Sequence, residues 1–257
     1  MSTIHVGTMG WSYCFWKGNF YPENLASKQF LAYYSKEFDT VEADSTFYRI
    51  PREKTVLDWK EQTSDGFVFS LKFPQKITHL KMFRECQEET RVFLERVELL
   101  EEKLGPLLLQ LPPFFPVERV DLLRVYLSGL PKEHRYVVEV RNAKLLNENF
   151  YFALKENKVA LAWVDNPSMP DITEVTGDFI YIRWEGDRKK VNGKLGKIEI
   201  DRTASINSWV KKLKPFFQKG TKVHGYFSKY YSGFPTSDAQ NFKKSWQARN
   251  SGDSGRF

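Results

Sequence analysis

Short runs rich in β-branched and aromatic residues alternate with longer stretches of helical period along nearly all of this 257-residue chain. This alternation constrains the fold more than any other feature, because it is typical of parallel strands joined by crossover helices. The repeats number close to eight, with strands expected at residues 4–9, 40–46, 67–73, 107–111, 136–141, 159–165, 179–184 and 223–228. The sequence therefore predicts an α/β fold, a single TIM-like (β/α)8 barrel.

Glycine and proline mark where the intervening helices end. The clearest helix is expected at residues 85–103, where apolar residues recur at helical spacing and Gly105 and Pro106 stop the pattern. Residues 166–177, between the sixth and seventh strands, are too few and too rich in proline for a full helix. We therefore expect one helix to be missing there, or to be replaced by a loop.

Composition bounds the domain count. With 41% hydrophobic and 16% aromatic residues, the chain has enough apolar material for one large core, and no linker-like segment divides it. We expect one barrel domain over residues 1–246. The last residues, 247–257, are polar and show no periodicity, so we expect a disordered tail.

Charge and cysteine usage bear on location and partners. The chain begins without a signal-like segment and has no apolar run of membrane-spanning length, so we expect a cytoplasmic protein without membrane contact. The two cysteines, Cys14 and Cys86, indicate neither a disulfide framework nor a metal site. A formal net charge of +7 favours anionic partners, including nucleic acid. Nothing in the sequence indicates an oligomeric state.

Polar side chains recur late in the predicted strands, and within a strand they fall two residues apart. These sets are Glu42, Asp44 and Thr46; Ser70 and Lys72; Glu139 and Arg141; Tyr181 and Arg183; Tyr226 and Ser228. Gln110 and Asp165 occupy the matching late position in the fourth and sixth strands. Because alternate residues share one face of a strand, and barrel sites form at the carboxyl ends of strands, we expect a polar pocket there. The alternative is a set of structural ion pairs that closes the barrel mouth.

Several motifs occur in order through the same segments: GWSY at residues 10–13, VEADSTFYRIP at 41–51, GPLLLQLPP at 105–113, VEVR at 138–141, YIRW at 181–184 and YSGF at 231–234. By these motifs, which extend over nearly the full chain, the sequence resembles domain-of-unknown-function family 72, the YecE-like proteins. The resemblance implies a TIM-type barrel with a central cleft, and it implies no reaction.

The sequence departs from the pattern expected of that family around the mouth. Asp44 stands where the family is expected to carry asparagine, and Asn142 stands where histidine is expected. The YIR run continues as Trp184-Glu185-Gly186 in place of His-Gly, and Ser228-Lys229 replaces an asparagine pair. Two histidines suited to proton transfer are therefore absent, and a mechanism that depends on them is not carried over to this chain.

Basic and aromatic residues make up the expected binding groups. Lys72, Arg141 and Arg183 are expected to hold an anion, because guanidinium groups pair bidentately with phosphate or carboxylate. The loop at residues 187–197 adds five further cations. Trp11, Tyr13 and Tyr226 are expected to form a stacking wall. The remaining expected contacts to the substrate are Asp44, Thr46, Tyr48, Gln110, Tyr181 and Ser228.

Carboxylates and one histidine are the candidate catalytic groups. Glu139 is assigned as a general base, Glu42 as an acid or orienting group, Asp165 as a further acceptor, and His79 lies near the mouth. The carboxylates would also suit Mg²⁺ or Mn²⁺, although no motif with metal-ligand spacing supports a metal or another cofactor. The sequence contains no P-loop, no GxGxxG that opens a crossover helix and no GxSxG elbow.

Three functions remain open from the sequence. The first is a pocket that binds a phosphate-bearing substrate such as nucleic acid and hydrolyses its phosphate ester. The second is a nucleic-acid-binding protein without turnover, which strong salt dependence without product would favour. The third is a glycosidase-like enzyme with paired carboxylates, for which the distance between the carboxylates is diagnostic.

Overall fold

The structure is a computed structural model that describes residues 3–250 of the chain. Eight parallel strands form one sheet in the order β1-β8-β7-β6-β5-β4-β3-β2. Their bounds are β1 Ile4–Thr8, β2 Thr40–Ala43, β3 Val68–Lys72, β4 Leu104–Gln110, β5 Tyr136–Glu139, β6 Ala160–Asp165, β7 Phe179–Trp184 and β8 Lys222–Phe227. The predicted single TIM-like barrel is confirmed.

The barrel closes between its first two strands through backbone contacts. Met9 and Glu42 form a parallel bridge, and the Gly10 amide donates a hydrogen bond to the Glu42 carbonyl at 2.8 Å. Gly7 permits this approach, because a Cβ atom at that position would lie 2.2 Å from the Thr40 carbonyl oxygen. The closure brings Glu42 to the rim of the barrel, next to the end of β1.

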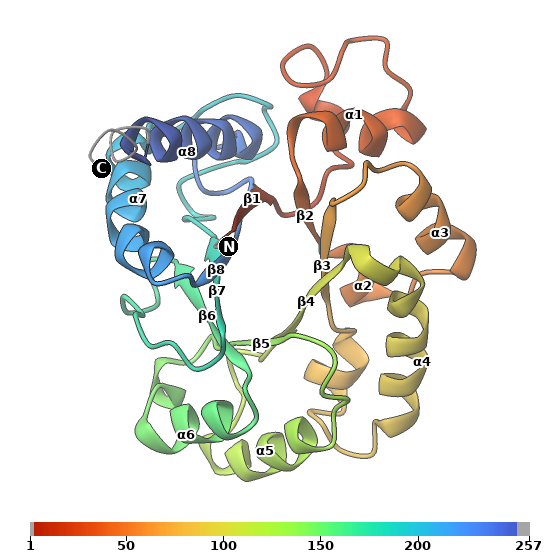
Figure 1. Cartoon of the computed structure of the whole chain (residues 1–257), viewed down its shortest axis with the longest axis vertical. Coiled ribbons are helices and arrows are strands. Elements are labelled where there is room, and N and C mark those ends of the chain that lie inside the picture. Colours follow the sequence, from red (N-terminus) through yellow and green to blue (C-terminus); the bar gives the residue numbers. More distant parts are fainter. Residues whose placement is uncertain (1–2, 251–257) are drawn as a thin grey trace.

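Helices surround the strands as an outer ring (Figure 1). The ring consists of α1 Phe30–Glu37, α3 Glu53–Glu61, α4 Gln87–Val97, α5 Val120–Ser128, α6 Glu148–Glu156, α7 Thr203–Gln218 and α8 Pro235–Asn250, whereas the short helix α2 Ser45–Tyr48 lies inside it, directly after β2. In the described part of the chain, no helix lies between β6 and β7, as the proline-rich segment predicted. No helix among residues 3–250 is both long and apolar enough to cross a membrane.

Several boundaries differ from the predicted ones; among the strands, β4 begins at Leu104 and β5 ends at Glu139, so Arg141 lies just beyond its strand. β2 ends at Ala43, and residues 45–48 turn into the short helix α2, so Thr46 is not a strand residue. The helix predicted at residues 85–103 is α4 followed by a 3-10 turn at Glu98–Lys103, with Glu101 in a positive-φ conformation. α8 continues to Asn250, past the predicted domain end at residue 246, and residues 251–257 lie outside the described residues.

The two faces of the strands differ in polarity as the alternation predicted. The outward side chains, such as Val41, Val138 and Ile182, are buried in the apolar layer beneath the helices. The inward layer is apolar low in the barrel, where Leu108, Val137 and Ala162 pack together. Higher up it becomes ionic, because Glu42, Glu139 and Arg183 are also buried. The charged layer therefore lies at the carboxyl ends of the strands, where sites form in barrels of this kind.

Candidate functional site

A polar cavity of about 380 Å³ opens at the carboxyl-terminal mouth of the barrel. Its lining residues come from the ends of several strands and from the loops that follow them: Asp44, Phe47, Tyr48, Lys72, Gln75, His79, Gln110, Arg141, Arg183, Glu185 and Arg188. A second recess, of about 520 Å³, shares Gln110, Arg141 and Arg188 with this cavity and continues toward Asp187 and Lys189. The predicted pocket therefore exists, and we call it the mouth cavity.

Arg183 is the centre of the ionic layer beneath the mouth cavity. Its Nη2 donates to Glu42 Oε1 at 2.7 Å, and its Nη1 donates to Glu139 Oε2 at 2.6 Å and to Glu185 Oε1 at 2.7 Å. Its Nε also points at the Glu42 carboxylate, at 3.0 Å. The side chain is only 2% exposed. Because its donors are already occupied, Arg183 serves as a structural hub and has little left to offer a ligand.

Arg141, by contrast, reaches the cavity with part of its guanidinium unoccupied. Its Nε pairs with Glu139, and its Nη2 donates to Glu185 Oε1 at 2.6 Å. Within residues 3–250, Nη1 makes no hydrogen bond, and the side chain is 20% exposed. Arg188 is more exposed still, its guanidinium lying 4.8 Å from the centre of the Tyr230 ring. These two arginines can contact a ligand in the mouth cavity.

Gln110 links Lys72 to this network. Lys72 Nζ donates to Gln110 Oε1 at 2.9 Å, and Gln110 Nε2 donates to Glu139 Oε1 at 2.9 Å. Nζ also lies 4.2 Å from the centre of the Phe47 ring. Lys72 is 8% exposed, and within residues 3–250 no carboxylate lies at salt-bridge distance from it. It is therefore a buried cation whose charge is not directly neutralised.

The two buried glutamates differ in proton affinity. Burial raises the pKa of Glu42 to about 7, with Asp44 adding to the effect and Arg183 opposing it. Burial also acts to raise the pKa of Glu139, but Arg141, Arg183 and Lys72 outweigh it and lower that pKa to about 2. A carboxylate of such low basicity is a weak general base near neutral pH. The pKa of Glu42 is better suited to a general base near neutral pH. Its side chain, however, is fully buried, is paired with Arg183 and accepts a hydrogen bond from the Tyr181 hydroxyl at 2.6 Å.

The rim of the cavity carries three further predicted residues. Asp44 approaches Arg183 Nη2 at 3.4 Å with its side chain 36% exposed, and Tyr48 is 74% exposed. His79 is half-buried on the cavity wall, and its Nδ1 lies 2.8 Å from Thr78 Oγ1. Burial lowers the pKa of His79, and Lys72 and Arg141 lower it further, so the ring is neutral at pH 7.

Six predicted substrate contacts lie outside the cavity, and four of them, Tyr181, Tyr226, Thr46 and Ser228, form hydrogen bonds within the barrel and its turns. The Tyr181 hydroxyl bonds Glu42 from below, and the Tyr226 hydroxyl lies 2.8 Å from both Thr40 Oγ1 and Ser70 Oγ inside the barrel. Thr46 donates to the Lys72 carbonyl at 2.6 Å, and Ser228 accepts the Tyr230 amide at 3.2 Å. These side chains hold strands and turns in place.

Asp165 and the expected aromatic wall are the larger corrections. Asp165 follows Trp163 on the outward face of β6 and accepts the Trp209 indole N–H of α7 at 2.8 Å, so it does not join the carboxylates of the mouth. Trp11 packs edge-on against Trp59, 5.4 Å away, in the outer layer. The Tyr13 hydroxyl donates to the Met9 carbonyl at 2.9 Å. The aromatic side chains that line the cavity are Phe47 and Tyr48.

Glu185 is the main site residue that the sequence reasoning missed. It is buried, accepts both Arg183 and Arg141, and follows Tyr181 and Arg183 by the same spacing of two residues. Extending the alternation one step beyond the strand would have found it. Phe47 and Gln75 line the cavity from a short helix and a loop, where no strand alternation can point to them, whereas Arg188 belongs to the basic loop that was predicted at residues 187–197.

No group of three or more His, Cys, Asp or Glu side chains among residues 3–250 is arranged to hold a metal ion. The four carboxylates considered for Mg²⁺ or Mn²⁺ do not converge. Asp165 faces α7, whereas Glu42 and Glu139 are engaged by arginine.

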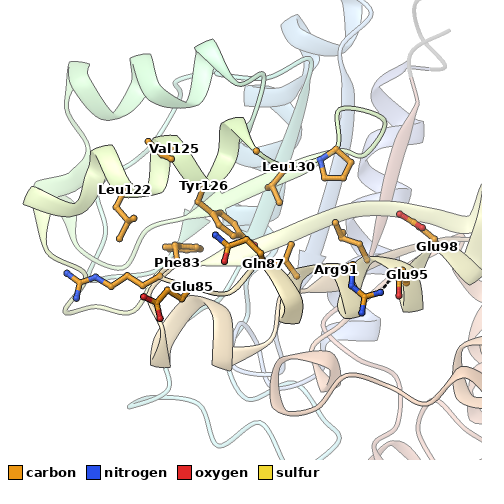
Figure 2. Close-up of a pocket in the computed structure, with 15 residues that line it drawn as sticks. Phe83, Glu85, Gln87, Arg91, Glu95, Glu98, Leu122, Val125, Tyr126 and Leu130 are labelled. Atoms are coloured by element: carbon orange, nitrogen blue, oxygen red, sulfur yellow. Dashed lines mark hydrogen bonds and ion pairs between the residues drawn. The ribbon is translucent and has the colours of Figure 1, made fainter.

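A larger recess, of about 800 Å³, lies outside the barrel between α4 and α5. Figure 2 shows Leu122, Val125 and Tyr126 on one side of it and Arg91 beside Glu95 on the other. Arg91 is already paired with Glu88 and Glu95 on its own helix, at 2.7 and 2.6 Å. We place the candidate site at the mouth instead, because among residues 3–250 the buried ionisable groups Lys72, Arg183 and Glu185 converge on that cavity.

Comparisons with known proteins agree with the fold. The sequence is 36% identical to the UPF0759 protein YecE of Escherichia coli (strain K12) over 139 residues, which is 54% of this chain and 48% of that protein, about half of its length. It is 26% identical to the UPF0759 protein YunF of Bacillus subtilis (strain 168) over 206 residues, 73% of this chain and 71% of that protein.

Solved structures extend the similarity to the whole barrel. The crystal structure of a DUF72 family protein from Thermotoga maritima matches with a TM-score of 0.78 and 26% identity, over 94% of this chain and 98% of that one. A DUF72 family protein from Enterococcus faecalis shares the fold, with a TM-score of 0.73 and 22% identity over 95% of this chain and 96% of that one. The family model "Protein of unknown function DUF72" matches residues 5–255. The chain therefore belongs to the DUF72 family.

Proposed function

We propose that the mouth cavity binds a small phosphate-bearing ligand, such as a nucleotide or the end of a nucleic acid strand. The observation that carries this proposal is Lys72, a buried cation on the cavity wall whose hydrogen-bond acceptor is the neutral amide of Gln110. Burial of an unpaired ammonium group is unfavourable, and an anion in the cavity would remove that cost.

Arg141 and Arg188 supply the remaining anion contacts. The unoccupied Nη1 of Arg141 and the exposed guanidinium of Arg188 line the same cavity as Lys72. Arg183 is excluded from this role, because Glu42, Glu139 and Glu185 occupy its donors. The cavity is thus a polar site with three available cations, and the ionic layer beneath it is largely neutralised.

Binding is the part of the hypothesis that the geometry favours, and hydrolysis is a separate step. Glu139, with a pKa of about 2, is poorly suited to accept a proton from water. The glycosidase alternative would need two accessible carboxyl groups, and both Glu42 and Glu139 are buried and bonded to Arg183.

The test is calorimetric titration with inorganic phosphate, a mononucleotide and a single-stranded oligonucleotide, across a salt series and with a check for cleavage. Loss of a charge-assisted contact costs about 1.5–3 kcal/mol, so Lys72→Met is expected to weaken phosphate binding about 10- to 100-fold. Lys54→Met is the matched control, because it removes the same charge from a side chain that is 86% exposed.

The outcomes separate the hypotheses. Phosphate binding that Lys72→Met leaves unchanged would refute the assignment. Oligonucleotide binding that depends steeply on salt but tolerates Lys72→Met would place nucleic acid on the outer surface.

A further inference from the structure

Two buried lysines in this chain are satisfied in different ways. Lys103 is 4% exposed, and its Nζ donates to the Lys60 carbonyl at 2.8 Å, the Thr63 carbonyl at 2.7 Å and Thr63 Oγ1 at 3.2 Å. All three N–H groups of its ammonium therefore have acceptors. Lys72 Nζ has one hydrogen-bond acceptor, Gln110 Oε1, and otherwise meets the Phe47 ring and the cavity. Lys103 is built as a structural cation and Lys72 is not.

Gln110 keeps the buried carboxylate away from Lys72. Its Nε2 donates to Glu139, so its Oε1 is left to face Lys72. The carboxylate of Glu139 is itself held by Arg141 and Arg183. A neutral amide thus stands between the amine and the nearest carboxylate in its hydrogen-bond chain. A neutral amine can still donate one N–H to Gln110 while its lone pair faces the cavity.

The surroundings of Lys72 ease the loss of a proton from its buried ammonium group. Burial is the largest influence on the pKa of Lys72 and lowers it; Arg183 lowers it as well, whereas the carboxylates Asp44, Glu139 and Glu42 act in the opposite direction, and the balance is a lowered pKa. The other ionisable groups on the cavity wall are Tyr48, His79, Arg141, Arg188 and Glu185. A desolvated lysine beside other cations is a recognised form of activated nucleophile.

We propose that Lys72 is a catalytic nucleophile that forms an imine with an aldehyde or ketone bearing a phosphate group. The substrate class rests on the proposed function, because Arg141 and Arg188 would hold the phosphate while the carbonyl carbon faces Nζ. Phe47 covers one side of the amine and limits the approach of water.

The step balances without an oxidant or reductant. The lone pair of the neutral amine attacks the carbonyl carbon, the C=O electron pair moves to oxygen, and a proton passes from nitrogen to that oxygen to give a carbinolamine. The hydroxyl group then takes up a proton and leaves as water while the nitrogen lone pair forms the C=N bond, and the nitrogen of the resulting iminium gives up its remaining N–H proton, so that no net proton is consumed. His79 lies on the same wall and can transfer these protons, because its ring is neutral. Addition of water reverses the sequence.

Reductive trapping tests this directly. The protein is incubated at pH 7 with glycolaldehyde phosphate and sodium cyanoborohydride, and the modified lysines are located and timed by peptide mass spectrometry. An ordinary lysine is neutral in about 1 molecule in 2,500 at pH 7. Because burial lowers the pKa of Lys72, a larger fraction of its side chain is neutral at that pH, and Lys72 is expected to be labelled faster than exposed lysines such as Lys54. Lys103, whose donors are all engaged, is expected to stay unmodified.

Variants and a second probe separate this inference from the proposed function. Lys72→Arg places a permanently protonated guanidinium at this position and abolishes the fast adduct, whereas Lys54→Arg leaves it unchanged. Labelling of wild-type Lys72 no faster than of Lys54 overturns the inference whatever the variants do, and phosphate binding by calorimetry then still stands on its own. Equally fast trapping of unphosphorylated glycolaldehyde, together with no phosphate binding, supports the nucleophile and refutes the phosphate site.

Discussion

Arg183 is expected to be the side chain whose loss most damages the barrel mouth. It is 2% exposed and forms ion pairs with Glu42, Glu139 and Glu185 at 2.6–2.7 Å. Arg183→Met keeps much of the side-chain volume but leaves these carboxylates buried without their common partner. Breaking a buried ion pair by removing one member costs about 3–5 kcal/mol. For a domain of this size, that corresponds to a Tm lower by about 6–20 °C.

Urea unfolding at pH 8 and pH 5.5 measures this effect. The destabilisation is expected to shrink at the lower pH, because carboxylates that lose their cation take up protons in the folded state. Arg124→Met is the matched control, since its partner Glu156 is also exposed and surface pairs contribute little. If Arg183→Met costs no more than Arg124→Met, or if its cost is the same at both pH values, the description of Arg183 as a hub is wrong.

Three further outcomes are expected. Glu42→Gln should flatten the stability profile between pH 5 and pH 8 in urea unfolding: the folded pKa of Glu42 is raised to about 7, so its contribution is present at low pH and is lost as pH rises through 7, and an unchanged slope would contradict this. Lys72→Met should leave the free energy of unfolding in urea unchanged or raise it, whereas Lys103→Met should lower that free energy by about 1–3 kcal/mol for each acceptor left without its donor. A loss for Lys72→Met as large as for Lys103→Met would show that Lys72 is structurally paired. Gly186→Ala should lower both thermal stability and phosphate affinity, because a Cβ would lie 2.2 Å from the Tyr230 carbonyl and Gly186 has a φ of +70°, and wild-type affinity would show that the loop carrying Arg188 does not shape the cavity.

Local pattern was sufficient for much of the fold and for the position of the site. Alternation of strand-like and helix-like segments predicted the barrel, since each crossover helix must cover a strand. Polar residues two positions apart along a strand predicted that Glu42, Glu139 and Arg183 lie on the inner face of the barrel, and the structure confirms this. The absence of a helix between β6 and β7 also followed from prolines and segment length.

The alternation of side chains along a strand did not predict which way Asp165 faces, because both faces of β6 are apolar. In β6, Ala162 and Val164 face inward and Leu161 and Trp163 face outward, so hydrophobicity alone does not assign a side to Asp165. The indole of Trp209, 44 positions away, decides it by donating a hydrogen bond. Sequence reasoning likewise ended the seventh strand one residue before Glu185.

The sequence by itself determined the barrel and the ring of ionisable side chains at its mouth, because both follow from periodicities of two and of about 3.6 residues. Only the tertiary structure decided which charges neutralise one another. Arg183 meets Glu42 across 141 positions and Glu139 across 44, while Lys72 meets the neutral Gln110 across 38. Such pairings depend on barrel closure and strand register. Closure and register pair Arg183 with buried carboxylates, which gives it a structural role, and they leave Lys72 without a carboxylate partner and therefore available to a ligand.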